Sequence, residues 1–191
     1  MLIILSAPSG CGKSSIAQRL LKLDNNLILS ISATTRAARC GEIEGTHYFF
    51  KNNDEFKKVD FLESATIHGN SYGTPQEFIE QKLSEGKNIL FDIDYQGAKQ
   101  IMESAQAKII STKIAGTKIV SIFILPPDIE TLRSRMINRG QDNIETINLR
   151  IASAASEMQN ASYYKYQVIN NDFDQAVREI QDIILFERKN K

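Results

Sequence analysis

The sequence predicts an α/β fold, in which a doubly wound parallel sheet with helices on both faces carries a small antiparallel insertion and a helical lid. Short apolar runs alternate with helical patterns along most of the 191 residues, as in parallel strands joined by helices. Two runs, 88–94 and 119–125, are nearly continuous in apolar residues, as strands covered on both faces must be. Between about residues 34 and 74 short strands and polar Gly-containing turns replace this alternation, which indicates the insertion.

The first half of the chain begins with an apolar strand at Leu2–Leu5, which runs into a Gly-rich turn. A helix follows from about Lys13 to Lys22, and a second strand is expected at Leu27–Ile31. Inside the insertion, His47–Phe50 and Phe61–Ile67 have the composition of short strands. These segments supply one edge of the core and most of the smaller sheet.

The second half continues with strands at Asn88–Asp94 and Ile119–Leu125, each followed by a helix. The next helix presents one apolar stripe, made of Ile144, Ile147, Ile151, Ala154, Ala155 and Met158. Asp142 is expected to cap that helix, with Glu145 as the acid at its third position. Val168–Ile169 is a final short strand. The last helix buries Phe173, Val177, Ile180 and Ile184.

Composition excludes several classes of protein. Basic and acidic residues number 23 each, so the formal net charge is zero, whereas proteins of nucleic acid or anionic membranes carry a basic surplus. No apolar run approaches the roughly 18 residues of a membrane span, and Met1–Leu5 lacks the features of a signal peptide. Two cysteines are too few for a disulfide framework. We therefore expect a cytoplasmic protein whose cationic sites are local.

A phosphate-binding loop follows the first strand. Residues 7–14 fit the pattern G-x-x-x-x-G-K-[ST], except that Ala7 stands at the first glycine. Gly10 and Gly12 let the backbone curl so that its N–H groups face phosphate oxygens, Lys13 supplies positive charge, and the Ser14 hydroxyl can bind Mg²⁺. The predicted nucleoside triphosphate site comprises Ala7, Pro8, Ser9, Gly10, Cys11, Gly12, Lys13, Ser14 and Ser15.

Cys11 has two interpretations. Its place near Lys13 and a helix N-terminus should favour the thiolate, and in that case alkylation would block activity. The alternative is that Cys11 is a small inert filler.

Arg36 and Arg39 lie three residues apart in a loop, where two guanidinium groups can grip one phosphate dianion. From surface statistics alone, two loop arginines are more often simply solvated.

A series of motifs beyond the loop resembles the guanylate kinase family along nearly the whole chain. The matching segments are Ser-Ala-Thr-Thr-Arg-Ala-Ala-Arg-Cys-Gly-Glu-Ile-Glu-Gly-Thr-His-Tyr (32–48), Phe-Leu-Glu (61–63), Gly-Asn-Ser-Tyr-Gly-Thr (69–74), Asp-Ile-Asp-Tyr-Gln-Gly-Ala (92–98), Phe-Ile-Leu-Pro-Pro (123–127), Arg-Ser-Arg-Met-Ile-Asn-Arg-Gly (133–140) and Asn-Asn-Asp (170–172). The resemblance implies transfer of phosphate from ATP to GMP with Mg²⁺, and dGMP is a candidate acceptor. It also implies a core at 1–33, 75–132 and 160–191, a GMP-binding domain at 34–74 and a lid at 133–159.

The resemblance further implies residue roles. The GMP phosphate falls to Arg36, Arg39, Tyr48 and Tyr72, and the guanine to Ser32, Glu63, Gly73, Thr74 and Asp94. ATP contacts are added by Arg135, Arg139 and Asn170, and the catalytic cations are Lys13, Arg36, Arg39, Arg135 and Arg150. Asp92 is expected to join Ser14 at the metal, through water.

Base selection has a chemical rationale at Glu63 and Thr74. One carboxylate can accept from guanine N1–H and N2–H while a hydroxyl donates to O6, and adenine reverses that pattern. Thr74 could instead cap the following helix, with Pro75 at its first position and Glu77 as the acid.

Several of these residues also have a purely structural interpretation. Asp92 and Asp94 could be caps for the next helix, and Arg135 and Arg139 could be surface charges. Glu63 could be an exposed strand residue, and Tyr48 and Tyr72 could be packing aromatics. Two rival functions differ from phosphate transfer to GMP in the residues they need. A kinase for a different acceptor would lose Glu63 and Thr74, and a non-catalytic interaction module would lose Lys13 or the lid arginines.

Overall fold

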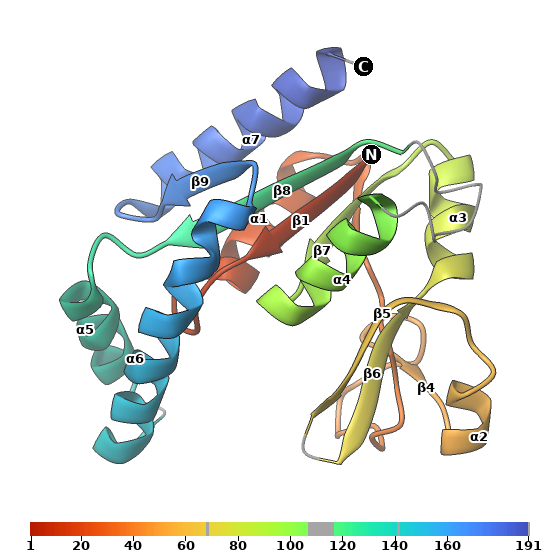
Figure 1. Ribbon diagram of the computed structural model, residues 1–191, viewed down its shortest axis with the longest axis horizontal. Coiled ribbons are helices and arrows are strands. Elements are labelled where there is room, and N and C mark those ends of the chain that lie inside the picture. Colours follow the sequence, from red (N-terminus) through yellow and green to blue (C-terminus); the bar gives the residue numbers. More distant parts are fainter. Residues whose placement is uncertain (68, 107–116, 141, 191) are drawn as a thin grey trace.

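The computed structural model describes residues 1–67, 69–106, 117–140 and 142–190 (Figure 1). Its elements are, in order, β1 (Leu2–Ser6), α1 (Lys13–Leu23), β2 (Leu27–Leu29), β3 (Ala33–Thr34), β4 (Phe49–Phe50), α2 (Asn53–Phe56), β5 (Phe61–Ile67), β6 (Asn70–Pro75), α3 (Gln76–Ser84), β7 (Asn88–Asp92), α4 (Tyr95–Gln106), β8 (Ile119–Leu125), α5 (Ile129–Arg139), α6 (Ile144–Met158), the 3₁₀ turn η1 (Gln159–Tyr163), β9 (Tyr166–Ile169) and α7 (Phe173–Lys189). None of the helices described is long and apolar enough to span a membrane.

A parallel sheet forms the centre of the molecule, with strand order β2-β7-β1-β8-β9 among the described residues. Its strands pair only in the parallel sense, with Leu2 opposite both Ile89 and Ile119. β1 lies at the centre, with β2 and β7 on one side and β8 and β9 on the other, which confirms the doubly wound topology. Parallel strands end at a common edge, so the loops after β1 and β7 lie together.

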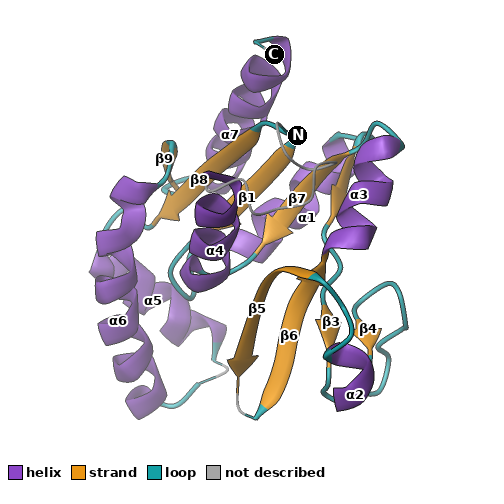
Figure 2. Cartoon of the chain, turned by 45° about the vertical axis from the view of Figure 1, so that its right-hand side comes forward, coloured by secondary structure: helices purple, strands orange, loops and turns teal. Residues whose placement is uncertain are grey.

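Helices cover both faces of this sheet, as the continuous apolar strands predicted. Side chains of α1 and α7 pack on one face with Ile3, Leu5 and Ile122. Those of α3 and α4 pack on the other with Ile4 and Phe91, and Figure 2 shows α4 in front of the sheet. All these strand residues are fully buried, so the loops at the strand ends stand on a rigid base.

The insertion forms a second sheet of order β4-β3-β6-β5. The predicted antiparallel pairing holds for β3 with β6 and for β5 with β6, but β3 and β4 are parallel, so the sheet is mixed. The loop from 35 to 48 is long enough to return the chain in the same direction, which a tight hairpin cannot do. The region also contains α2, a short helix with a capping box at Asn52 and Glu55 that the sequence analysis missed.

The helices α5 and α6 form a hairpin on the side of the core away from the small sheet (Figure 1). Gly140 ends α5 with a left-handed backbone (φ 64°), a conformation glycine adopts without strain. The expected cap at Asp142 is wrong: Asn143 caps α6 and accepts from Thr146 N–H at 2.8 Å. The helix begins at Ile144, one residue later than a cap at Asp142 would place it, so the Asp142 carboxylate is available for a different contact.

Candidate functional site

The phosphate loop lies between β1 and α1, at the carboxyl edge of the sheet. Gly10 and Gly12 have φ values of 85° and 82°, so both adopt the left-handed backbone that the tight curl requires. No side chain caps the start of α1, whose first amides are therefore available to an anion. The local geometry matches the predicted phosphate site.

Lys13 is held at the end of β7. Its Nζ donates to the Ile93 carbonyl at 2.7 Å and lies 2.8 Å from Asp92 Oδ1. Both charged side chains are about one-fifth exposed, at 19% and 21%. The positive charge therefore stands beside the loop with a carboxylate partner, at the edge where phosphates would lie.

The loop forms a cavity of about 610 Å³ with residues from three other parts of the chain, namely the segment after β7, α5 and α6. The lining consists of Ala7, Pro8, Ser9, Gly10, Cys11, Gly12, Lys13, Ser14, Ser15, Asp94, Arg135, Arg139 and Glu157. The structure thus brings the predicted loop residues together with Arg135 and Arg139. Arg135 is anchored at the cavity, since it donates to the carbonyls of Asn170 at 2.9 Å and Asn171 at 3.2 Å.

Asn170 lies against the loop. Its Nδ2 donates to the Cys11 carbonyl at 2.8 Å, and a Cβ added to Gly12 would come within 3.0 Å of the same nitrogen. The side chain is 4% exposed, and among the described residues its Oδ1 has no hydrogen-bond partner. In this structure Asn170 therefore holds the loop backbone, and contact with adenine remains a prediction.

The expectation of a reactive Cys11 thiolate is wrong. Cys11 is 1% exposed, and its burial raises the pKa of the thiol to about 12, against a smaller opposite effect of the Arg135 charge. The side chain belongs to the apolar cluster beneath the loop, so Cys11 is the packed filler of the alternative interpretation.

The small sheet brings Glu63 and Thr74 together as opposed residues of β5 and β6. Thr74 Oγ1 donates to Glu63 Oε1 at 2.7 Å, and the two residues are 0% and 8% exposed. Burial raises the pKa of Glu63, and the Thr74 hydrogen bond partly opposes this. The capping role considered for Thr74 is wrong, because Pro75 precedes α3 and no side chain caps that helix.

Two glycines leave the space that the Glu63–Thr74 pair occupies. A Cβ at Gly73 would lie 2.9 Å from the Glu63 carbonyl oxygen, and a Cβ at Gly97 would lie 3.1 Å from Glu63 Oε2. The first turn of α4 therefore approaches the carboxylate closely. Asp94 caps that turn by accepting from Gly97 N–H at 2.9 Å, so the capping alternative holds for Asp94 in this ligand-free structure.

A cluster of charged and aromatic groups lies beside the pair. The Arg36 guanidinium carbon stands 5.4 Å from the centre of the Tyr48 ring, and the rings of Tyr48 and Tyr72 meet edge to face at 6.0 Å. Arg36 also pairs with Glu42, at 2.8 and 3.0 Å, a partner that the sequence analysis missed. The Arg39 side chain is exposed and Ser32 is half-buried.

Asp142 joins the two lid arginines. Its Oδ2 lies 3.0 Å from Arg150 Nη1 and 3.5 Å from Arg139 Nη2. The carboxylate is 12% exposed, so it bridges α6 to the end of α5 from a mostly covered position. The sequence analysis placed Asp142 at a helix cap, and so missed this contact.

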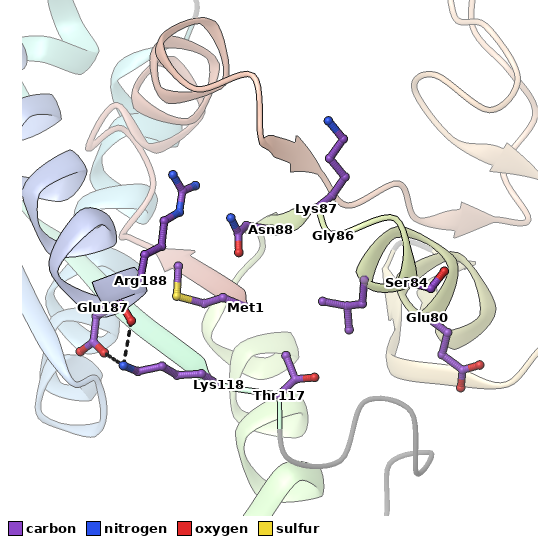
Figure 3. A pocket seen from close by; sticks show the side chains of 11 residues that line it. Met1, Glu80, Ser84, Gly86, Lys87, Asn88, Thr117, Lys118, Glu187 and Arg188 are labelled. Carbon is purple, nitrogen blue, oxygen red and sulfur yellow. Dashed lines mark hydrogen bonds and ion pairs between the residues drawn. The ribbon is translucent and has the colours of Figure 1, made fainter. Parts of the chain in front are cut away.

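A second cavity, of about 720 Å³, lies at the opposite, amino edge of the sheet (Figure 3). The carboxyl ends of α3 and α7 contribute to its lining, and helix carboxyl ends disfavour anions. Lys118 satisfies the end of α7 by donating to the carbonyls of Glu187 and Asn190, at 2.9 and 2.5 Å. The cavity at the amino edge is therefore less suited to phosphate than the cavity at the carboxyl edge.

Comparison with known proteins points to one family. The family model described as "Guanylate kinase" matches residues 1–187. The chain is 51% identical to the guanylate kinase of Rickettsia felis over 193 residues, covering 99% of this chain and 95% of that protein. It is 44% identical to the guanylate kinase of Rhizobium meliloti, covering 98% and 83%. A crystal structure of guanylate kinase from Anaplasma phagocytophilum matches with a TM-score of 0.70 and 33% identity, over 98% of this chain and 85% of that one.

Proposed function

Because the chain belongs to the guanylate kinase family and transfers a phosphoryl group from ATP to GMP, we propose that two half-sites divide these substrates between them. The phosphate-loop cavity takes ATP, and the Glu63–Thr74 pair takes GMP together with the Arg36 cluster. The position of Asp94 carries the proposal, because Asp94 lines the loop cavity and accepts from the N–H of Gly97, where an added Cβ would lie 3.1 Å from Glu63 Oε2. One segment after β7 thus borders both half-sites, as reaction between two bound nucleotides requires.

On the ATP side, the amides of residues 10–14 receive the phosphates at the start of α1. Lys13 turns from its partner Asp92 toward the transferred group, and Arg135 supplies charge from the cavity wall. Arg139 and Arg150 reach the phosphates from the lid once they leave Asp142. These cations spread positive charge around the transferring phosphoryl group.

On the GMP side, Glu63 accepts from guanine N1–H and N2–H. Thr74 has one hydroxyl hydrogen and donates it to Glu63, so we assign Thr74 to orienting that carboxylate. Adenine would set a ring nitrogen acceptor against Glu63 and leave the buried carboxylate unsatisfied. Arg36, Arg39, Tyr48 and Tyr72 receive the GMP phosphate, while Ser32 and Asp94 border the base.

The attacking oxygen belongs to the GMP phosphate, which is already anionic near neutral pH. The reaction therefore needs no strong general base, and alignment and cationic charge supply most of the catalysis.

Mg²⁺ fits the oxygen donors beside the loop. The exposed Ser14 hydroxyl lies in the first turn of α1 and the Asp92 carboxylate lies at the end of β7, and Mg²⁺ prefers such oxygen ligands. The described residues contain no group of three or more His, Cys, Asp or Glu that could hold an ion alone. An ion here would take its remaining ligands from phosphates and water, and would supply charge that neutralises phosphate oxygens.

The proposal extends to domains, acceptor and compartment. Residues 34–74, which include most of the small sheet, bind GMP, and residues 133–159, which include most of the α5–α6 hairpin, close over ATP. The proposed contacts involve the base and the phosphate, so dGMP is a candidate acceptor. We assign the cytoplasm because Cys11 and Cys40 are free thiols, as expected in a reducing compartment.

Coupled ADP release with ATP, Mg²⁺ and GMP, AMP, CMP or UMP tests the proposal. Turnover with GMP alone is the expected result. Turnover with another monophosphate would refute the assignment of Glu63 and Thr74. GMP binding without turnover would favour an interaction module.

A further inference from the structure

Glu42 touches both arginines assigned to the GMP phosphate, and nothing above gives it a role. It lies in the loop between β3 and β4. Its carboxylate accepts from Arg36 Nη1 at 3.0 Å and Nη2 at 2.8 Å, and also from the Arg39 backbone N–H at 2.7 Å. The carboxylate and the guanidinium are 17% and 15% exposed, so the pair is largely shielded from water.

The backbone fixes Glu42 from the other side. Its N–H donates to the Arg39 carbonyl at 3.0 Å, which closes a turn over residues 39–42. Gly41 has φ 85° at the third position of that turn, where a left-handed backbone is required. Arg39 and Glu42 are thus tied together twice, once through the backbone and once through the carboxylate.

The pairing leaves part of the guanidinium available. Arginine has five N–H donors, and Arg36 uses its two terminal nitrogens on Glu42, with Nη1 also reaching the Ala37 carbonyl at 2.7 Å. The Nε–H and the second hydrogen of Nη2 form the other bidentate edge of the group. Interaction with Glu42 first, and with Tyr72 to a smaller extent, raises the pKa of Arg36, so the group keeps its positive charge.

We infer that Glu42 is a positioning residue for the acceptor phosphate. It orients the Arg36 guanidinium so that its free edge faces the phosphate, and it holds the Arg39 turn in the same arrangement. This inference rests on the proposed function, because it takes Arg36 to be a ligand of the GMP phosphate. The contrary possibility is that Glu42 competes with the phosphate for Arg36. A positioning role predicts that loss of the Glu42 carboxylate raises KM for GMP, whereas competition predicts that it lowers KM for GMP.

The test compares E42Q with the matched control E44Q. Glu44 is two residues away in the same loop and its Oε2 accepts from Phe50 N–H at 2.8 Å, so E44Q makes the same change in charge without touching Arg36. For E42Q we expect KM for GMP to rise about tenfold, which is about 1.4 kcal/mol. KM for ATP and the inhibition constant of guanosine, which has no phosphate, should stay within about twofold. Thermal unfolding of each variant verifies that it is folded.

A second comparison uses R36A and R36A/E42Q. Without Arg36, the Glu42 carboxylate is an unpaired negative charge near the phosphate, so E42Q should lower KM for GMP in that background although it raises KM in the wild type. A lower KM for GMP in E42Q alone would show competition and overturn the inference. The inference would also be overturned if E42Q and E44Q changed KM for GMP equally, or if E42Q changed KM for GMP in the same direction in the wild type and in R36A.

The R36A variant distinguishes a failure of the proposed GMP phosphate site from a failure of the role inferred for Glu42. If R36A leaves KM for GMP unchanged, the proposed phosphate site is wrong and the role of Glu42 is refuted with it. If R36A raises KM for GMP but E42Q does not, only the inference about Glu42 is refuted.

Discussion

Thr74→Val tests how the buried hydroxyl contributes to base selection. Valine keeps the shape of threonine but removes the donor that lies 2.7 Å from Glu63 Oε1. A hydrogen bond to a charged group contributes about 1.5–3 kcal/mol, and both side chains are buried here, so the loss should approach that range. This corresponds to a decrease of roughly 10- to 100-fold in kcat/KM for GMP.

The effect should be confined to the guanine side of the reaction. Coupled ADP release gives kcat/KM for GMP and for AMP, together with KM for ATP. AMP draws no benefit from a well-oriented Glu63 carboxylate, so its kcat/KM should change little and the GMP/AMP ratio should fall by roughly the same factor as kcat/KM for GMP. KM for ATP should not change.

Thr131→Val is the matched control. Thr131 Oγ1 also donates to a carboxylate, Asp128 Oδ2 at 3.0 Å, but this pair is exposed at the start of α5. The control variant should leave the GMP/AMP ratio unaltered. If Thr74→Val kept kcat/KM for GMP within about twofold of the wild type, the hydroxyl would not orient Glu63 and the reasoning would be refuted.

Three further predictions follow from burial and charge. Burial raises the pKa of Glu63 above the ordinary value of 4.5, so KM for GMP should increase as pH falls through that raised pKa while KM for ATP stays level; a GMP profile that stayed flat from neutral pH down to 4.5 would contradict it. Hydrogen bonds from Lys118 first, then from other donors, lower the pKa of Glu187 to about 2, so its stabilisation is complete above the ordinary value of 4.5 and is lost as pH falls toward 2. Glu187→Gln should therefore lower the free energy of unfolding in urea by about 2 kcal/mol at pH 7 and by less at pH 3, and equal losses at both pH values would refute the linkage. Iodoacetamide should label the exposed Cys40 and spare Cys11 at pH 7.5, with activity retained; mass spectrometry that found Cys11 alkylated in the folded enzyme would disprove the burial argument.

Much of the core could be predicted because each signal was local. Apolar runs such as Ile119–Leu125 have no alternative to burial on both faces, and the structure has that strand with the same ends. The phosphate loop is equally local, since Gly10 and Gly12 supply the backbone freedom that its curl needs.

The parts that could not be predicted depend on distant partners. Cys11 has the sequence neighbours of a thiolate, but its pKa is set by the apolar cluster beneath it, which no spacing reveals. Thr74 has the sequence context of a helix cap, and the opposite strand instead supplies Glu63 as its acceptor. Glu42 lies three and six residues beyond two arginines, a spacing that becomes informative only when the turn is known to fold back.

The neutral net charge and the local cationic site have one physical explanation. Lys13, Arg36 and Arg150 each have a carboxylate partner within 3.0 Å, namely Asp92, Glu42 and Asp142. Partly covered cations without counter-charges would destabilise the fold, so each is paired with an internal acid. Under the proposed function, phosphates would compete with these acids when substrates bind.

These acids should not all behave alike when substrate binds. Among the contacts of the described residues, the Asp92 carboxylate pairs with Lys13 and the Asp142 carboxylate pairs with Arg139 and Arg150, and neither carboxylate accepts from a backbone N–H. A phosphate can therefore replace either carboxylate as the cation turns away. Glu42 also accepts from a backbone N–H, so it stays in place when the cation acquires a second anion. Exchange at Lys13 and Arg150 and retention at Arg36 therefore follow from one difference in hydrogen bonding.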